Sequence, residues 1–230
     1  MKLRAAYWIV VVTLPVVVLI TAGRLVMAPP FFNFIYTQTS IPPDPYGFTL
    51  EDRLSYGALG VQYLLERRPI DFLAEQILPG ERCFPVQQSP CAMFNDRELR
   101  HMVDVQNVTW GLFSLGAGAT FALVLAAAWL ATGERRAWLI AALEASSALL
   151  LVSIALVGAA IVFAWDAFFD GFHALFFEDE TWRFWYSDTL IRLYPEPFWI
   201  NGAIIIAALA SFSAFVILAA SRWYRSHRGT

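Results

Sequence analysis

The stretch AWLIAALEASSALLLVSIALVGAAIVFAW, residues 137–165, decides the fold class of this protein. It carries a single charged side chain, Glu144. About 20 helical residues are enough to cross a hydrocarbon core of about 30 Å. A segment with this length and composition is therefore expected to be a transmembrane helix.

The composition of the whole chain points the same way. Of its 230 residues, 58% are hydrophobic and 15% charged, and the mean hydropathy is +0.55. A soluble domain is about half apolar and about a quarter charged. Nine Trp, nineteen Phe and eight Tyr suit membrane interfaces, where aromatic rings meet headgroups. A net charge of −3 without a long basic run excludes disordered and nucleic-acid-binding proteins.

The uncharged or nearly uncharged stretches predict four spans, so the fold class is an all-α membrane protein with four transmembrane helices. The spans are expected at residues 5–27, 105–133, 137–165 and 197–221. The first follows Lys2 and Arg4, as a cleavable signal peptide would. Its apolar run exceeds the usual length of about 7–15 residues, and no clear cleavage site follows. We interpret it as a retained helix.

Lysine and arginine predict the orientation, because they favour the cytoplasmic side. The N-terminus, the turn between spans two and three, and the tail 222–230 together hold seven of them, against the single acid Glu134. Segments 28–104 and 166–196 instead hold more acids than arginines, ten against six and seven against two. We expect both termini in the cytoplasm. Segment 28–104 would form a small, mainly helical extracellular cap, with 166–196 as a second outer segment.

Local patterns divide the first outer segment. Residues 28–46 are rich in proline and aromatic residues, which favours extended or turning chain. Thr49 and Asp52 form a capping-box pattern, followed by apolar residues at helical spacing as far as Leu65.

Two further helices are predicted in the same segment. One short helix is expected to begin at Pro69 and to end before Pro79. Another begins after Asn95, with Glu98 three residues later as its capping partner, and runs without a breaker into the second span.

The two cysteines, Cys83 and Cys91, both fall in the outer segment and are separated by seven residues. Outside the cytoplasm such a pair can oxidise, so we expect a disulfide that closes a small loop. This spacing alone is a poor signature of a metal site.

Two histidines are the candidates for catalysis. His101 is expected just outside the second span, and His173 just outside the third, on a helix that continues the third span through Trp165 to His173. Both would lie at the outer membrane surface and so be able to meet. His227, in the basic tail, is expected to be solvated or to face headgroups.

Charged residues lie at helical spacing from both histidines. A carboxylate beside an imidazole fixes its tautomer and favours its protonated form, which suits acid–base catalysis. Arg97, four residues before His101, is a candidate for holding a phosphate or an oxyanion. The expected supporting carboxylates are Glu98, Asp104, Asp166 and Asp170.

Structural roles compete with these interpretations. For a single histidine of this kind, a helix cap or a headgroup contact would be the favoured role. Because two histidines are expected at one depth, a functional role and a structural role are equally favoured. No ferritin-like repeat of histidine and glutamate supports a metal site.

Glu144 is interpreted as structural, reaching towards the cytoplasmic interface or bonding to Ser147. No motif supports an acyl-enzyme on serine or cysteine.

Two stretches carry a family resemblance. The first is MFNDRELRHMVDV, residues 93–105, with Phe, Glu, His three residues later and Asp-Val. The second comprises Trp165-Asp166, Phe172-His173, Phe176-Phe177, Trp182, Asp188, Leu190-Ile191 and Pro195. In order and flanks both resemble the lipoprotein intramolecular transacylase (Lit) family of four-span bacterial membrane proteins.

The resemblance implies an enzyme of the bacterial cytoplasmic membrane with its site on the extracellular face. It would move an acyl chain from the glyceryl sn-2 oxygen of a lipoprotein's N-terminal lipidated cysteine to the α-amine of that cysteine. The family's catalytic histidines would fall on His101 and His173. We hypothesise His101 as base on the amine and His173 as its partner, although the sequence does not distinguish them.

Because donor and acceptor share one molecule, the enzyme mainly supplies orientation and proton movement, and no cofactor or metal is expected. The expected partners are lipidated lipoprotein N-termini and bilayer lipids, with no nucleic acid, and the chain is expected to be a monomer. The alternatives are a non-enzymatic scaffold or sensor and another lipid-interface acyltransferase or hydrolase. A transporter is least favoured, because it would need polar residues within the spans.

Overall fold

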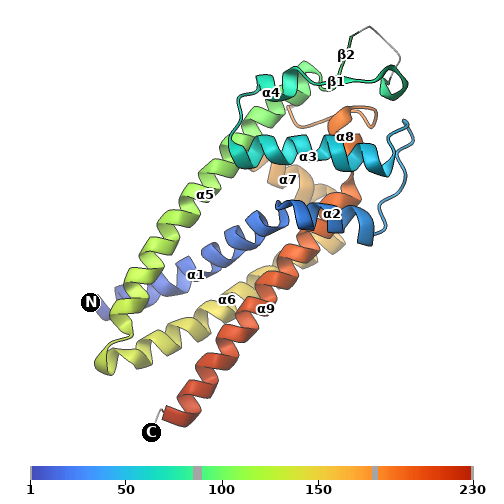
Figure 1. Cartoon of the computed structure of the whole chain (residues 1–230). Helices are drawn as coiled ribbons and strands as arrows, with labels where there is room; N and C mark the ends of the chain where they lie inside the picture. The colour runs from blue at the N-terminus through green and yellow to red at the C-terminus, as the bar shows by residue number, and fades with distance from the viewer. Residues whose placement is uncertain (1, 85–89, 178–180, 229–230) are drawn as a thin grey trace. The chain divides into compact units, whose positions relative to one another are not determined.

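The chain is mainly helical (Figure 1), and its computed structural model describes residues 2–84, 90–177 and 181–228. It divides into two compact units. The span unit comprises Met1–Arg24, Gly111–Phe168 and Ile205–Thr230, and the second unit comprises Leu25–Trp110 and Phe169–Ile204.

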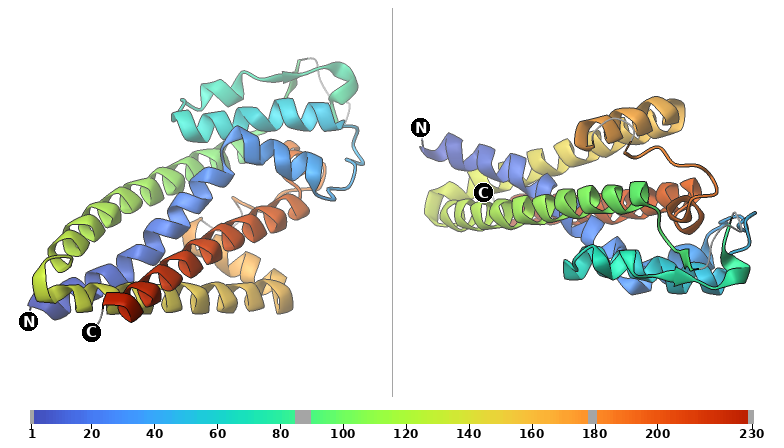
Figure 2. Two further views of the ribbon diagram at one scale, coloured as in Figure 1. Left: turned by 60° about the horizontal axis from the view of Figure 1, so that its bottom comes forward. Right: turned by 90° about the horizontal axis from the view of Figure 1, so that it is seen from above.

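Four long helices confirm the four predicted spans. Each is long and apolar enough to cross a membrane. Figures 1 and 2 show these helices running side by side through the span unit. They are α1 (Lys2–Val26), α5 (Asp96–Leu130), α6 (Arg136–Phe163) and α9 (Glu196–Arg228), with the 3-10 turn η2 (Gly133–Arg135) between α5 and α6.

Small and aliphatic side chains pack the helices of the span unit together. Val10 of α1 and Leu130 of α5 are fully buried in one cluster with Ala142 of α6. Leu150 of α6 and Ala210 of α9 are fully buried in another. Large apolar side chains elsewhere on these helices point outward, as expected where acyl chains replace water as the solvent.

Glu144, the one charge in the third span, is paired across two helices. Its Oε2 lies 2.6 Å from Nη2 of Arg225, which follows the fourth predicted span on α9. Ser147 donates instead to the carbonyl oxygen of Leu143. The structure therefore supports a structural role for Glu144 through an ion pair, not through Ser147.

The second unit consists of short helices and one small antiparallel sheet, together with the first turns of α5 and most of α7. Ile77 pairs with Ala92, and Leu78 with Cys91. Its further elements are α2 (Pro29–Gln38), α3 (Leu50–Glu66), α4 (Asp71–Ala74), β1 (Ile77–Leu78), η1 (Gly80–Arg82), β2 (Cys91–Ala92), α7 (Trp165–Phe176) and α8 (Thr189–Leu193).

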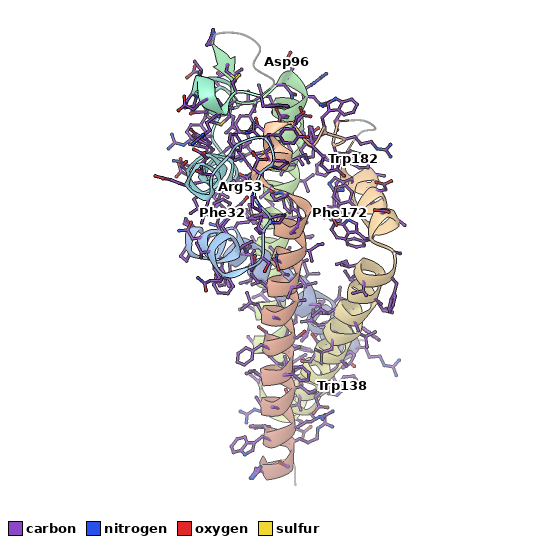
Figure 3. All side chains as sticks on the ribbon, turned by 90° about the vertical axis from the view of Figure 1, so that its right-hand side faces the viewer. Phe32, Arg53, Asp96, Trp138, Phe172 and Trp182 are labelled. Carbon is purple, nitrogen blue, oxygen red and sulfur yellow. A yellow bond between two sulfur atoms is a disulfide. The ribbon has the colours of Figure 1, made fainter. Side chains whose placement is uncertain are left out.

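An aromatic and aliphatic core fills this unit, with a buried ion pair beside it. The core includes Phe32, labelled in Figure 3, and Tyr194. Arg192 and Asp44 pair at 3.1 Å, both almost fully buried. Arg53, also labelled in Figure 3, donates to the carbonyl oxygen of Arg192. These contacts join helices α3 and α8 to the connection between α2 and α3.

Two predictions for this unit are confirmed. The Thr49 side chain accepts from the Asp52 backbone, and the Asp52 side chain accepts from the Thr49 backbone, so the capping box starts α3. Cys83 and Cys91 form the expected disulfide.

One other local prediction is wrong, and another is right in kind but too long. Residues 29–38 form helix α2 instead of extended chain. Pro29 and Pro30 occupy its first positions, where the missing N–H groups would have no helical partner anyway. The short helix expected from Pro69 is only the single turn Asp71–Ala74. The chain after it turns to strand β1 because Ile77 and Leu78 pair with residues beside the disulfide.

The continuous helix expected from the third span through His173 is also wrong, because the chain breaks at Ala164. Its φ of −149° and ψ of 49° lie outside the helical region. Its N–H closes α6 on the carbonyl of Ala160, and its carbonyl oxygen accepts from Phe168 in α7. Backbone hydrogen bonds therefore form on both sides of the break, and neither proline nor glycine stands at it.

Candidate functional site

The N-terminal turn of α5 positions His101. The Asn95 side chain accepts from the Glu98 backbone at 3.0 Å, and the Asn95 backbone donates to the Glu98 carboxylate at 2.8 Å. This reciprocal cap is the one predicted from the sequence. His101 follows Glu98 by three residues, within the second unit and four residues before the predicted span.

His101 lies in an apolar setting. Its ring centre is 4.9 Å from that of Phe177 and 5.2 Å from that of Phe184. Its Nδ1 is buried and has no hydrogen-bond partner among the described residues. Burial, followed by the proximity of His173, lowers the pKa of His101 to about 4. The imidazole is therefore neutral near pH 7.

His173 is held by its own helix in a defined tautomer. Its Nδ1 lies 2.8 Å from the carbonyl oxygen of Phe169. Because a carbonyl only accepts, Nδ1 carries the hydrogen, and the lone pair of the neutral ring is on Nε2. Burial lowers the pKa of His173, while the hydrogen bond to Phe169 and the charge of Asp170 oppose this.

The structure brings the two histidines to one aromatic cluster. The ring centre of Phe177 lies 4.9 Å from that of His101 and 5.6 Å from that of His173. Trp182 stacks on His173 at 4.8 Å, and Phe169 contacts the same imidazole at 4.0 Å. We call Phe169, Phe177, Trp182 and Phe184 the aromatic cluster.

The sequence did not predict these rings as site residues. The contacts of Trp182 and Phe184 depend on how residues 181–188 pack, and the sequence of this segment has no helical or strand periodicity. A weak signal was present in the second motif, which contains Phe177 and Trp182.

The predicted carboxylate effect occurs at His173, where the charge of Asp170 raises the pKa, but burial outweighs it, and burial lowers the pKa of both rings. Glu98 is buried and accepts from the Leu190 backbone at 2.7 Å, so it joins α5 to α8. Burial raises its pKa to about 7. Asp170 is exposed and lies 3.6 Å from Arg183. Asp104 lies half-buried on α5.

Asp166, the fourth predicted carboxylate, is exposed on the first turn of α7. It belongs to the span unit, whereas His173 belongs to the second unit. Its supporting role stays a prediction.

Arg97 is held by Asp188, a partner that the sequence did not predict. Its Nη2 lies 2.5 Å from Asp188 Oδ2, and its guanidinium lies over the ring of Phe184 at 5.6 Å. Asp188 also accepts from the Asn95 side chain at 3.1 Å. Because Phe184 contacts His101, this ion pair supports one wall around that histidine.

The site is suited to moving protons beside apolar groups. Two neutral imidazoles face aromatic rings, and the nearby guanidinium groups of Arg97 and Arg183 each pair with a carboxylate. No group of three His, Cys, Asp or Glu side chains able to hold a metal ion occurs within residues 2–84, 90–177 and 181–228.

Fold and site together define a four-span integral membrane protein with a histidine pair among aromatic rings. The family model described as lipoprotein intramolecular transacylase Lit matches residues 8–199. The chain belongs to the Lit family, and it is an intramolecular acyltransferase with lipoprotein transacylase-like function.

Solved structures show the same fold. The membrane-integral lipoprotein intramolecular transacylase Lit from Bacillus cereus matches with a TM-score of 0.78 at 16% identity, over 99% of this chain and 98% of that chain. A variant of it with one histidine replaced by alanine matches with a TM-score of 0.73 at 18% identity, over 99% and 96%. An uncharacterized protein from Aquifex aeolicus (strain VF5) is 27% identical over 218 residues, covering 91% of this chain and 90% of its own.

Proposed function

We propose that this enzyme moves an acyl chain from the glyceryl sn-2 ester to the α-amine of the N-terminal lipidated cysteine of a membrane lipoprotein. His101 and His173 supply general acid–base catalysis at the outer face of the bacterial cytoplasmic membrane. The observation that carries the catalytic part is the contact of both imidazoles, from separate helices, with the one ring of Phe177.

The reaction balances within one substrate molecule. The amine nitrogen attacks the ester carbonyl carbon, and the carbonyl electron pair moves onto its oxygen. When this oxyanion collapses, the bond to the glyceryl oxygen breaks. The amine loses one proton and the glyceryl oxygen gains one, so the enzyme needs only to position the groups and move that proton.

The geometry favours His173 as the base, the reverse of the assignment hypothesised from the sequence. With Nδ1–H donating to Phe169, Nε2 is left to take a proton from the amine and return it to the glyceryl oxygen. His101, with a pKa of about 4, is a weaker base. It contributes a neutral ring that hydrogen-bonds to the substrate.

Expression in cells that make diacylated lipoproteins and lack N-acylation tests this proposal. The N-terminal peptide of a lipoprotein is fragmented by tandem mass spectrometry, because intramolecular transfer leaves the total mass unchanged. We expect an acyl chain on the α-amine with wild type, and none with His101→Ala or His173→Ala.

His227→Ala is the matched control, since His227 is exposed near the C-terminus and stacks on Trp223. It should retain the wild-type product. An unmodified amine beside well-expressed, monodisperse wild-type protein would contradict the proposed reaction.

A further inference from the structure

Trp182 buries a hydrogen-bond donor that has no partner. Trp182 is only 7% exposed, and its Nε1 is buried without a hydrogen bond among the described residues. Two other indoles of the same unit are satisfied, because Trp110 and Trp199 each donate to a backbone carbonyl at 2.9 Å. An unsatisfied buried donor costs free energy, so its retention at this place calls for an acceptor that arrives with a ligand.

The unpaired donor is next to the proposed base. The indole of Trp182 stacks on the His173 imidazole with ring centres 4.8 Å apart and planes at 30°. It contacts Phe169 edge-on at 5.8 Å. Figure 3 shows Trp182 beside helix α7.

Two of the polar groups nearby are already engaged, whereas Nδ1 of His101 and Nε of Arg97 are, like the Trp182 donor, buried without a hydrogen-bond partner among the described residues. The Nδ1–H of His173 is used by the Phe169 carbonyl, and Arg97 pairs with Asp188. The indole N–H differs from an imidazole because it only donates and keeps its proton near neutral pH. A donor of this kind suits an oxygen that becomes negative during a reaction, since it stabilises charge without exchanging a proton.

We propose that Trp182 is a further catalytic residue, whose Nε1–H donates a hydrogen bond to the acyl carbonyl oxygen of the substrate. This inference rests on the proposed acyl transfer. When the amine attacks, the electron pair that moves onto the carbonyl oxygen is held by the Trp182 donor. When the glyceryl C–O bond breaks, the pair returns to form the amide carbonyl.

Two replacements separate the donor from the ring. Trp182→Phe keeps an aromatic ring against His173 and removes the N–H. Incorporating 3-benzothienylalanine at position 182 keeps the bicyclic shape and replaces only the N–H by sulfur. Trp185→Phe is the matched control, because Trp185 is three residues away and 72% exposed.

The experiment measures steady-state kinetics of purified, detergent-solubilised full chain on a synthetic diacylated lipopeptide. Losing one oxyanion donor should lower kcat about 100-fold in both position-182 variants. Because the donor acts mainly in the transition state, KM should change less than about threefold and the pH profile should keep its shape. Trp185→Phe should match wild type.

The outcomes distinguish this inference from the reaction on which it rests. A benzothienylalanine variant with wild-type kcat would overturn the donor role, even if Trp182→Phe were inactive, and would leave the acyl transfer standing. If the position-182 variants kept the wild-type maximal kcat but shifted its pH profile, Trp182 would act by supporting His173. That result would also overturn the donor role. Wild-type protein without any acyl transfer would overturn both.

Discussion

Burial decides the ionisation of the residues at the centre of the site. His101 loses affinity for protons, whereas Glu98, one turn earlier on α5, gains it. Both changes favour neutral groups near the aromatic cluster. Glu98 joins α5 to α8 through the backbone of Leu190, and both imidazoles of the site are uncharged near neutral pH.

Glu98 should make the stability of the protein depend on pH. Its pKa is raised from 4.5 to about 7 on folding, so its contribution is fully present below pH 4.5 and is lost as pH rises through 7. We predict that Glu98→Gln lowers the thermal unfolding midpoint, and that its deficit relative to wild type grows from pH 8 to pH 5.

The measurement is thermal unfolding in detergent. Its control is Glu51→Gln, because Glu51 is an exposed residue of α3. A Glu98→Gln deficit that is constant over pH 5–8 would contradict the raised pKa. His101 acts in the opposite sense, because its lowered pKa costs stability as pH falls from 6.5 towards 4. It is present in both proteins, so the comparison of variants cancels it.

The Arg97–Asp188 pair should matter for activity through Phe184. Asp188→Asn leaves the guanidinium without its charge partner and frees the ring that contacts His101. Since small displacements of positioning groups are costly, we expect a loss of activity of about tenfold. The charge-swapped double variant Arg97→Asp/Asp188→Arg should recover part of it in the lipopeptide assay. Additive losses would show that the two residues act independently.

At the scale of elements, the long apolar helices could be predicted because a bilayer leaves a buried backbone few alternatives to helix. The capping boxes at Thr49 and Asn95 were also predictable, since both use contacts within four residues. Helix α2 and the break at Ala164 were not. The break at Ala164 is set by backbone hydrogen bonds that leave no residue pattern, whereas the Pro29-Pro30 pair at the start of α2 suits a first helical turn and was interpreted as extended chain.

The same distinction applies to the site. The histidine pair could be predicted because the order of the spans places the start of the second span and the end of the third span at the same side of the membrane. The contact of Phe184 with His101 could not, because it joins segments far apart in sequence, and the contact of Trp182 with His173 could not, because ring packing leaves no residue pattern.

The disulfide should stabilise the sheet and the turn before it. It joins Cys83, just after η1, to Cys91 in β2, and the preceding Arg82 pairs with Asp52 at 2.6 Å. By loop entropy a short closed loop is worth about 2–3 kcal/mol. We predict that Cys83→Ser/Cys91→Ser lowers the unfolding midpoint by several degrees while wild type in reductant approaches the same value. Equal midpoints for wild type and the variant would contradict a stabilising role.

In the whole molecule, a site on the outer face requires a definite membrane topology. With both cysteines in the disulfide, the chain has no free thiol to interfere with labelling. We predict that Glu75→Cys reacts with a membrane-impermeant maleimide in intact cells and that Glu134→Cys reacts only after the membrane is opened. Both positions are exposed, so accessibility depends on the side of the membrane. Labelling of residue 134 in intact cells would contradict the orientation.

In the proposed reaction one substrate molecule donates and receives the acyl chain, and His173 moves the proton. The most direct test of this reaction mixes purified enzyme with two diacylated lipopeptides of different sequence, only one of which carries an isotopically labelled sn-2 chain. Tandem mass spectrometry should find the labelled chain on the α-amine of its own peptide alone, and no amide with His173→Ala. Labelled amide on the other peptide, or full activity of His173→Ala, would contradict the account.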